Sequence, residues 1–384
     1  MKKKIAILGA SGSVGTQAID VARQRGYEID YITVGRNVRV AEDVVRRFGV
    51  KTVAVADSDA YRDLKVRLSD TDTRILFGEE GILEGIGKTS AETVINSIIG
   101  EAGLLPTLAV IDEGKRLALA NKESLVIAGE IVMRRAKEKN AQILPVDSEH
   151  SAIFQSLKAG KPSEIKSIIL TASGGPFYGK SKEELRSVTL ADTLAHPTWK
   201  MGKKITVDSA TLMNKGFEVI EAVHLFGVPE DKVKVTVHRE SILHSAIEYI
   251  DNTVIGEMSS PDMRMCVQYA VDYPDRMPSK SEPLDLFKVG RLTFAEPDYE
   301  AFPLLALAKS AIREGGAVPA VLNAADEVAV AAFLGERISF LGISEVVLRT
   351  VDALSSARKV HTLDGIIECD KEARALAEKF VGEI

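Results

Sequence analysis

Short apolar runs alternate with longer amphipathic segments over the first 150 residues. The apolar runs lie at residues 4–8, 29–34, 52–56, 93–99, 116–120 and 142–146. Between most of them, apolar side chains recur every three or four residues, which is the spacing of one helix face. Strands that alternate with helices predict a doubly wound α/β domain with a parallel sheet. We expect this domain to cover residues 1–150.

A glycine-rich segment, Gly9-Ala10-Ser11-Gly12-Ser13-Val14-Gly15, separates the first expected strand from the first helix. Its glycines lie three residues apart, which is a variant of the spacing found in dinucleotide-binding folds. Glycines at this point let backbone amides and a helix N-terminus approach a pyrophosphate. The sequence therefore predicts a Rossmann-like domain that binds a dinucleotide.

The end of the second expected strand selects the dinucleotide. It reads Gly35-Arg36-Asn37 and contains no acidic residue. NAD sites usually carry an acid here for the ribose hydroxyls, whereas an arginine accommodates a 2′-phosphate. A guanidinium pairs with phosphate, and an aspartate would repel it. We therefore predict NADPH; the alternative is a surface arginine in a turn.

Two later strands of this domain are followed by charged side chains. Asn121-Lys122-Glu123 follows one strand, and Asp147-Ser148-Glu149 follows the next. Both segments should lie at the carboxyl edge of the sheet, where open α/β sheets bind ligands. Asp147 and Glu149 would point the same way from an extended segment, and a divalent cation would relieve their repulsion. The alternative is a solvated strand end with two surface acids.

The pattern changes near residue 150, and a central α+β catalytic domain is expected over residues 151–273. An expected strand at 165–171 leads into Ala172-Ser173-Gly174-Gly175-Pro176-Phe177, a turn of small residues suited to holding an anion. The stretch from Leu190 to Met201 lacks apolar periodicity and contains the only tryptophan, Trp199. Long loops in enzymes are often lids, so we predict a lid at about 190–203.

A helical pattern after Gly216 places Glu218 in a first turn, where it would complement the helix dipole or serve as a third oxygen ligand. Segments 233–237 and 242–249 look like antiparallel strands. They carry His238 and His244, for which a core or surface position is the ordinary interpretation.

The last third of the chain is expected to be a scaffold. Residues 274–303 are proline-rich and irregular, as in a linker. Residues 304–384 contain amphipathic segments at 304–313, 320–334, 344–357 and 370–381, which predict a C-terminal helical bundle. Glycines at 315, 316 and 335 stand where helix stops are expected.

Composition narrows the function. The 384 residues carry a net charge of −6 with a pI near 5.7, which argues against nucleic-acid binding. Two cysteines are too few for a disulfide framework, which favours a reducing compartment. The apolar run behind Met1-Lys2-Lys3-Lys4 is too short for an export signal, and none is long enough to span a membrane. We therefore expect a cytoplasmic protein with no membrane partner.

The order of these motifs resembles one family, the 1-deoxy-D-xylulose 5-phosphate reductoisomerases, over essentially the whole chain. The matching segments are Gly9 to Gly15, Leu119-Ala120-Asn121-Lys122-Glu123-Ser124-Leu125, Leu144-Pro145-Val146-Asp147-Ser148-Glu149-His150, Ser173-Gly174-Gly175-Pro176-Phe177, His196-Pro197-Thr198-Trp199, Val207-Asp208-Ser209-Ala210-Thr211, Met213-Asn214-Lys215-Gly216 and Leu322-Asn323-Ala324-Ala325-Asp326-Glu327. The chain departs from the family pattern at Arg239-Glu240, where Pro-Gln is expected, and at Cys266, where proline is expected. Neither position is among those that the family uses for chemistry.

The resemblance implies NADPH-dependent conversion of 1-deoxy-D-xylulose 5-phosphate into 2-C-methyl-D-erythritol 4-phosphate, a step of non-mevalonate isoprene biosynthesis. It implies that Asp147, Glu149 and Glu218 bind Mg²⁺ or Mn²⁺, with Co²⁺ also possible, and that Lys122 joins them in catalysis. The implied substrate contacts are Lys122, Ser148, Glu149, Ser173, His196, Ser209, Asn214, Lys215 and Glu218. The implied cofactor contacts are Ser11, Gly12, Ser13, Val14, Gly35, Arg36, Asn37, Asn121, Glu123 and Gly202. Trp199 and Met201 would act as the lid, His244 would line the site, and a homodimer is expected.

Some alternatives remain open at this point. The rearrangement can proceed by retro-aldol cleavage and aldol addition or by a concerted α-ketol shift, and both need the same groups. The general base can be Lys122 or a water on the metal. A simple NADP-dependent dehydrogenase would not need three oxygen ligands, and neither would a non-catalytic NADPH-sensing module.

Overall fold

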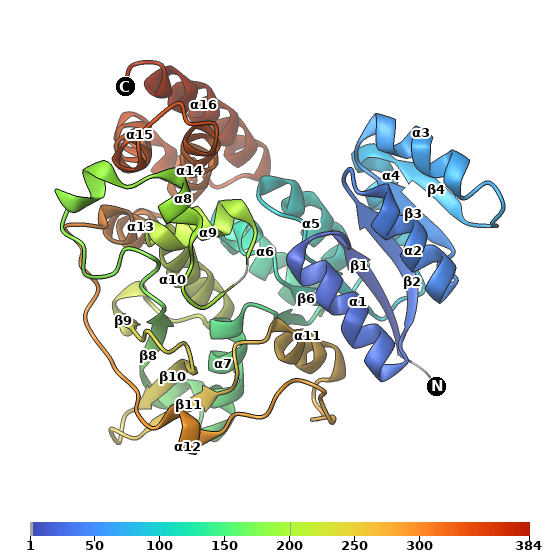
Figure 1. Cartoon of the computed structure of the whole chain (residues 1–384), viewed down its shortest axis with the longest axis horizontal. Coiled ribbons are helices and arrows are strands. Elements are labelled where there is room, and N and C mark those ends of the chain that lie inside the picture. The colour runs from blue at the N-terminus through green and yellow to red at the C-terminus, as the bar shows by residue number, and fades with distance from the viewer. Residues whose placement is uncertain (1–2, 200) are drawn as a thin grey trace. The chain divides into compact units, whose positions relative to one another are not determined.

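The computed structural model describes residues 3–199 and 201–384 of the chain, which form two compact units. The first unit consists of residues up to Ser124, Val132–Ser151 and Asp262–Glu282. The second consists of Leu125–Ile131, Ala152–Pro261 and Pro283–Ile384. Figure 1 shows the elements of both units by label. None of the described helices combines the length and the hydropathy needed to cross a membrane.

The first unit is built on a seven-stranded parallel sheet in the order β4-β3-β2-β1-β5-β6-β7. Its strands are β1 Lys4–Leu8, β2 Glu28–Val34, β3 Thr52–Val55, β4 Arg74–Phe77, β5 Thr93–Asn96, β6 Arg116–Leu119 and β7 Ile143–Pro145. The order reverses between β1 and β5, and such a switch point is where doubly wound sheets bind their ligands. The predicted Rossmann-like doubly wound sheet is therefore confirmed.

Helices connect these strands. They are α1 Ser13–Arg25, α2 Val38–Phe48, α3 Ser58–Arg67, α4 Gly78–Lys88, α5 Leu104–Asp112 and α6 Glu123–Lys139, and α7 Ser148–Ser156 follows β7. Gly26 and Gly49 end α1 and α2 in the left-handed conformation, which costs glycine no steric strain. The apolar runs of the sequence form the buried strands, as in β1, where Ile5 to Leu8 are at most 1% exposed.

Strand β4 and helix α4 are not predicted from the sequence. The apolar run of β4 is only three residues long, Ile75 to Phe77, and Leu76 is its one buried side chain. In α4 glycines interrupt the apolar pattern, and Gly85 is required by packing, since a Cβ there would lie 2.2 Å from the Tyr31 ring. Glycine lowers helix propensity. Because packing requires a glycine here, the sequence of α4 has only a weak helical signal.

Helix α11, Met263–Asp272, packs on α1 and belongs to the first unit. Asp272 is buried, accepts a hydrogen bond from the Tyr27 hydroxyl at 2.6 Å and forms an ion pair with Lys3 at 3.0 Å. The sequence analysis placed this segment in the central domain because it follows that domain in the chain. The contacts of α11 instead group it with the first unit. The other predicted domain boundaries stay predictions.

The second unit contains a four-stranded sheet in the order β11-β10-β8-β9, with β8 Ile165–Ala172, β9 Val233–Val237, β10 Leu243–Tyr249 and β11 Val254–Met258. The segments 233–237 and 242–249 run antiparallel in one sheet, as predicted, but they do not pair with each other. Strand β8 lies between them, parallel to β9 and antiparallel to β10. The connection from β9 to β10 therefore passes β8, which lies between them in the sheet.

Helices complete the second unit: α8 Leu190–Leu194, α9 Lys203–Ala210, α10 Met213–Phe226, α12 Leu286–Val289, α13 Pro303–Glu314, α14 Val318–Leu334, α15 Phe340–Ala353 and α16 Leu363–Val381. The last four confirm the predicted C-terminal helices, and α14 packs against both α15 and α16 (Figure 1). The predicted linker holds only the single turn α12 and a bridge from Ala295 to Val237.

Candidate active site

The glycine-rich turn after β1 is shaped for a ligand close to its backbone. Gly9 has φ +81°, and its N–H donates to Thr33 Oγ1 at 2.8 Å. A Cβ on Gly15 would lie 2.2 Å from the Gly9 carbonyl oxygen, so only glycine lets α1 begin this close to the strand. Ser11, Gly12 and Val14 are half-buried and Ser13 is exposed at the start of α1. A turn of this kind at the switch point of the sheet fits a pyrophosphate.

Arg36 extends from the end of β2, next to the exposed Gly35 and Asn37, and is 89% exposed. Its Nε donates to Asp57 Oδ2 at 2.9 Å, while Asp57 also caps α3 through the N–H groups of Asp59 and Ala60. These contacts lower the pKa of Asp57, first through the Ala60 N–H and then through Arg36. The contact fixes the guanidinium by one edge at the rim of an open pocket of ≈ 470 Å³. The remaining edge of the guanidinium suits a phosphate.

Asn121 holds the chain at the end of β6. Its side-chain amide donates to the carbonyl oxygens of Ile98 and Gly100 at 2.8 and 2.9 Å and to Glu123 Oε2 at 2.9 Å. Its carbonyl oxygen accepts from the Ser124 N–H at 3.0 Å. The side chain is thus committed to shaping this loop, and a cofactor contact by Asn121 would have to use its backbone.

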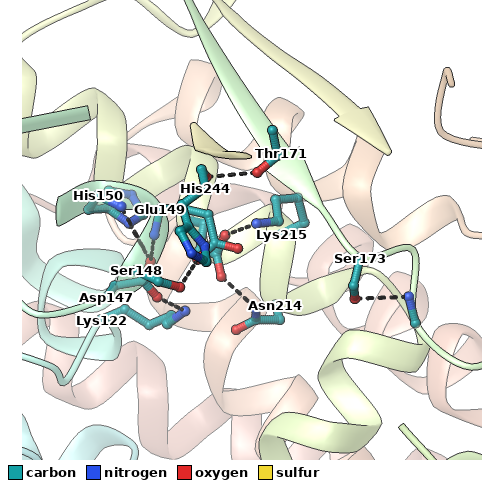
Figure 2. Close-up of polar contacts among 12 residues, drawn as sticks. Lys122, Asp147, Ser148, Glu149, His150, Thr171, Ser173, Asn214, Lys215 and His244 are labelled. Carbon is teal, nitrogen blue, oxygen red and sulfur yellow. Dashed lines mark hydrogen bonds and ion pairs between the residues drawn. The ribbon is translucent and has the colours of Figure 1, made fainter. Parts of the chain in front are cut away.

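Asp147 is the centre of a charged group at the end of β7 (Figure 2). Lys122 Nζ donates to its Oδ2 at 2.6 Å, and His150 Nδ1 lies 3.0 Å from its Oδ1. The side chains of Lys122 and Asp147 are only 7% and 10% exposed. Burial acts to raise the pKa of Asp147, but Lys122 and His150 outweigh it and hold that pKa well below its usual range. Asp147 is therefore a carboxylate at any neutral pH.

The extended geometry expected for Asp147 and Glu149 is wrong, because α7 already begins at Ser148. Asp147 lies just before the helix and accepts from the backbone N–H of Glu149 at 3.1 Å, which is the bonding of an N-cap. Glu149 is in the first turn, where its Oε2 accepts from Ser148 Oγ at 2.5 Å. A helix N-terminus stabilises both negative charges, so the two acids are held at this strand end by a helix.

Glu218, the third predicted ligand, lies in the second unit on α10. The expectation that it stands in a first helical turn is wrong, since α10 begins at Met213. Glu218 is 1% exposed; it pairs with Lys215 and accepts from Asn214 Nδ2 at 2.5 Å. Asn214 and Lys215 precede Glu218 by four and three residues, so each is a neighbour of Glu218 on the helix surface. The helix dipole does not explain a buried glutamate with these partners. Asn214 and Lys215, two predicted substrate contacts, therefore contact Glu218, the predicted metal ligand.

The anion turn after β8 has the backbone that its sequence predicts. Gly174 and Gly175 have φ of +76° and +65°, and a Cβ on Gly175 would lie 2.6 Å from the Ser209 carbonyl oxygen. The turn therefore packs directly on α9, which carries Ser209. Ser173 Oγ accepts from the Gly175 N–H at 3.2 Å and lies 3.1 Å from His196 Nε2. Three predicted substrate contacts thus meet around one turn.

His196 is held in one tautomer. Its Nδ1 accepts the backbone N–H groups of Thr198 and Trp199 at 3.2 and 2.9 Å, so the ring hydrogen is on Nε2. Burial, with a further contribution from Arg239, lowers the pKa of His196 to about 4. At neutral pH the ring is a neutral donor directed at Ser173 Oγ.

The predicted lid is partly helical. Residues 190–194 form α8, which Thr189 and Asp192 cap reciprocally, so the expectation of a loop from Leu190 onward is wrong. The Thr189 and Asp192 spacing is a capping box, which was present in the sequence. The ring centroids of Trp199 and His244 lie 6.2 Å apart, Met201 is half-buried and Gly202 is the N-cap of α9. Lys200 of the predicted lid lies outside the described residues.

Comparison with known proteins covers almost the full chain. Three family models match: "1-deoxy-D-xylulose 5-phosphate reductoisomerase" at residues 5–129, its C-terminal domain at 143–226, and "DXP reductoisomerase C-terminal domain" at 258–376. The chain belongs to the 1-deoxy-D-xylulose 5-phosphate reductoisomerase family.

Relatives of that name include proteins of Acetivibrio thermocellus, 50% identical over 99% of this chain and 100% of the relative, and Caldanaerobacter subterraneus, 51% identical over 97% of each. The reductoisomerase of Zymomonas mobilis in complex with NADPH has a TM-score of 0.93 and 40% identity, covering 100% of both chains. A DOX-P reductoisomerase in complex with NADPH, fosmidomycin and magnesium has a TM-score of 0.93 and 38% identity, covering 99% of this chain and 98% of that one.

The structure adds site residues of this reductoisomerase family member that the sequence analysis did not assign. His150 is fully buried and orients Asp147. It lies three residues after Asp147, so a helix starting at Ser148 would have indicated from the sequence that the two side chains meet. Glu221 is buried one turn beyond Glu218 on the same helix. Arg239 had been set aside as a local departure, yet it contacts the anion turn.

Proposed function

We propose that this chain converts 1-deoxy-D-xylulose 5-phosphate into 2-C-methyl-D-erythritol 4-phosphate, with NADPH as reductant and a divalent metal as cofactor. The observation that carries the proposal is the half-buried carboxylate pair at the end of β7, Asp147 held by Lys122 and His150 with Glu149 beside it. This pair lies at the ligand-binding edge of a dinucleotide-binding sheet. Relatives that match the chain over nearly its full length are named for this activity.

Asp147, Glu149 and Glu218 would hold the metal. Carboxylate oxygens are the ligands that Mg²⁺ and Mn²⁺ prefer, and no soft ligand stands among the three. The ionised state of Asp147 fits this role, because a ligand must be deprotonated. When bound, the metal would stabilise negative charge that develops on the substrate oxygens during rearrangement. Three related solved structures contain magnesium.

The second unit would hold the substrate phosphate. Ser173, His196 and Ser209 surround the anion turn, and Lys215 and Asn214 stand on α10. The Ser173 hydroxyl, the His196 Nε2–H and the Lys215 ammonium are donors of the kind a phosphate needs. If the C3–C4 bond breaks, an anchored phosphate keeps the C4–C5 fragment that carries it in the site, and the metal would hold the C1–C3 fragment, so that C2 can bond to C4 without a diffusional search.

Reduction would follow rearrangement. The branched aldehyde, formed by retro-aldol and aldol steps or by an α-ketol shift, takes a hydride from NADPH bound along β1 and β2. Lys122 lies beside Asp147 and would hold or donate a proton at a substrate oxygen. Trp199 and Met201 would cover the site, and His244, packed 6.2 Å from Trp199, would line it. Exclusion of water protects the reactive enediol.

One assay tests the proposal. Protein is mixed with NADPH and 1-deoxy-D-xylulose 5-phosphate, with Mg²⁺ or with a chelator, and the absorbance of NADPH is followed. We expect consumption that requires both the substrate and the metal. Consumption that survives chelation would exclude the metal role, and an absence of consumption under all conditions would exclude the reaction.

Three further properties belong to the proposal. The enzyme would be a homodimer, as the family resemblance implies. It would reside in the cytoplasm, where the free thiols of Cys266 and Cys369 stay reduced. It would bind no nucleic acid, because its net charge is −6.

A further inference from the structure

Arg239 connects the loop after β9 to the anion turn. Its Nη1 donates to the carbonyl oxygens of Ser173 at 2.7 Å and Gly175 at 2.6 Å. Its guanidinium lies over the Tyr178 ring, 5.1 Å from the centroid. Two short bonds from a charged donor, together with this ring contact, fix the side chain against the turn from the side of its carbonyl groups.

These contacts act on the residue that donates to the predicted phosphate. Ser173 Oγ accepts from the Gly175 N–H, and His196 Nε2 supplies a second hydrogen. With both acceptor positions of the oxygen used, the hydroxyl hydrogen of Ser173 is directed outward to a ligand. Gly174 and Gly175 both have positive φ. Two consecutive glycines can change to other backbone conformations more easily than any other pair of residues. Arg239 restrains this turn by holding the carbonyl groups on either side of Gly174.

The charge of Arg239 is directed at the same place. Among the described residues it forms no ion pair with a carboxylate. Its neighbour Glu240 instead accepts from Thr293 Oγ1 at 2.8 Å and lies 3.1 Å from His238 Nδ1. The Arg239 charge also contributes to the lowered pKa of His196, after burial. An uncompensated guanidinium behind an anion turn strengthens binding of a dianion on its other face.

We propose that Arg239 is a positioning residue of the substrate phosphate site: it fixes the Ser173–Gly175 turn in its donor conformation and adds positive charge behind it. This inference rests on the proposed function, since it assigns the turn to the phosphate of the substrate. It gives a role to a position where the chain departs from the family pattern.

The first test is kinetic and compares Arg239→Gln, Arg239→Lys and the matched control Glu240→Gln. For Arg239→Gln we expect KM for 1-deoxy-D-xylulose 5-phosphate to rise about 10-fold or more, the loss typical of a bond to a charged donor, with a smaller change in kcat. Arg239→Lys keeps the charge and should recover part of the loss. Glu240→Gln and the NADPH affinity of all variants should match the unsubstituted protein. Unchanged KM in Arg239→Gln, or an equal rise in Glu240→Gln, would overturn the proposal.

The second test needs no turnover. The six histidines are labelled for NMR, and the His196 signal is followed during titration with inorganic phosphate and with pH. Arg239→Gln should weaken phosphate binding and raise the pKa of His196, because a nearby positive charge has been removed. A merely structural role would leave the His196 pKa in place in the folded variant. If the unsubstituted protein consumes no NADPH, the proposed function fails, whereas a phosphate titration that is identical in both proteins refutes the role of Arg239.

Discussion

Asp147 provides a prediction that separates two roles of one side chain. It would be a metal ligand, and it is also the N-cap of α7 and the ion-pair partner of Lys122. Asp147→Asn removes the charge but keeps a side-chain oxygen that can accept the Glu149 N–H. Asp147→Ala removes both. The two variants should therefore lose activity together but differ in stability.

The magnitudes follow from the contacts. Breaking a buried ion pair costs about 3–5 kcal/mol, and with side chains 7% and 10% exposed this cost applies to both variants. The N-cap contributes about 1 kcal/mol, which only Asp147→Ala loses. In a unit of this size that difference lowers Tm by about 2–4 °C. Loss of a metal ligand that supplies about 3 kcal/mol of transition-state stabilisation slows turnover about 100-fold in both.

The assays are thermal unfolding with a chelator present, so that metal binding does not contribute, and NADPH consumption with Mg²⁺. We expect both variants to be at least about 100-fold slower, with Asp147→Ala melting below Asp147→Asn. Near-normal turnover by Asp147→Asn would refute the metal-ligand role. Equal melting of the two variants would refute the capping role, even if the turnover results hold.

Three other changes give further predictions. Glu149→Gln should reduce turnover by about two orders of magnitude with unchanged NADPH affinity, measured by fluorescence titration; near-normal turnover would show that Glu149 is not a ligand. Arg36→Asp should shift the ratio of KM for NADPH to KM for NADH by about 10-fold or more, since an acid repels the 2′-phosphate; an unchanged ratio would contradict the contact. Glu248 has its pKa lowered to about 2 by donors on Lys166, Ser167 and Lys234. Because this pKa is lower in the folded state than in the unfolded state, ionised Glu248 stabilises the protein at pH values above its unfolded-state pKa. This stabilisation is lost as the pH falls toward 2. The difference in urea midpoint between Glu248→Gln and the unsubstituted protein should therefore be larger at pH 6 than at pH 3, and a difference independent of pH would refute the assignment.

The parallel sheet could be predicted because its strands are buried on both faces. Ile5 to Leu8 form an apolar run with no polar interruption, and the glycine pattern after it is required by backbone approach at Gly9 and Gly15. Strand β4, in which only Leu76 is buried, has a run of just three apolar residues, Ile75 to Phe77, which is a weaker signal. Detection from sequence therefore followed burial.

The identities of the site residues could be predicted, but their local geometry could not. Asp147 was placed on an extended segment, although an aspartate before Ser148-Glu149-His150 is also a helix-start signal, which was not read. For Glu218 no such signal existed. Leu212 stands at the N-cap of α10 with φ +60° and makes no side-chain cap, so the helix start is set by tertiary structure.

Arg239 shows why a further part of the site could not be predicted. Its partners are carbonyl oxygens of residues 64 and 66 positions earlier in the chain. Every residue offers a carbonyl oxygen, so the acceptor side of such a bond leaves no mark in the sequence. Only the donor is visible, and from the sequence alone it was an arginine at an unexpected position. A residue that departs from the pattern of its family while bonding to the backbone of a binding turn therefore changes the site without changing its motif.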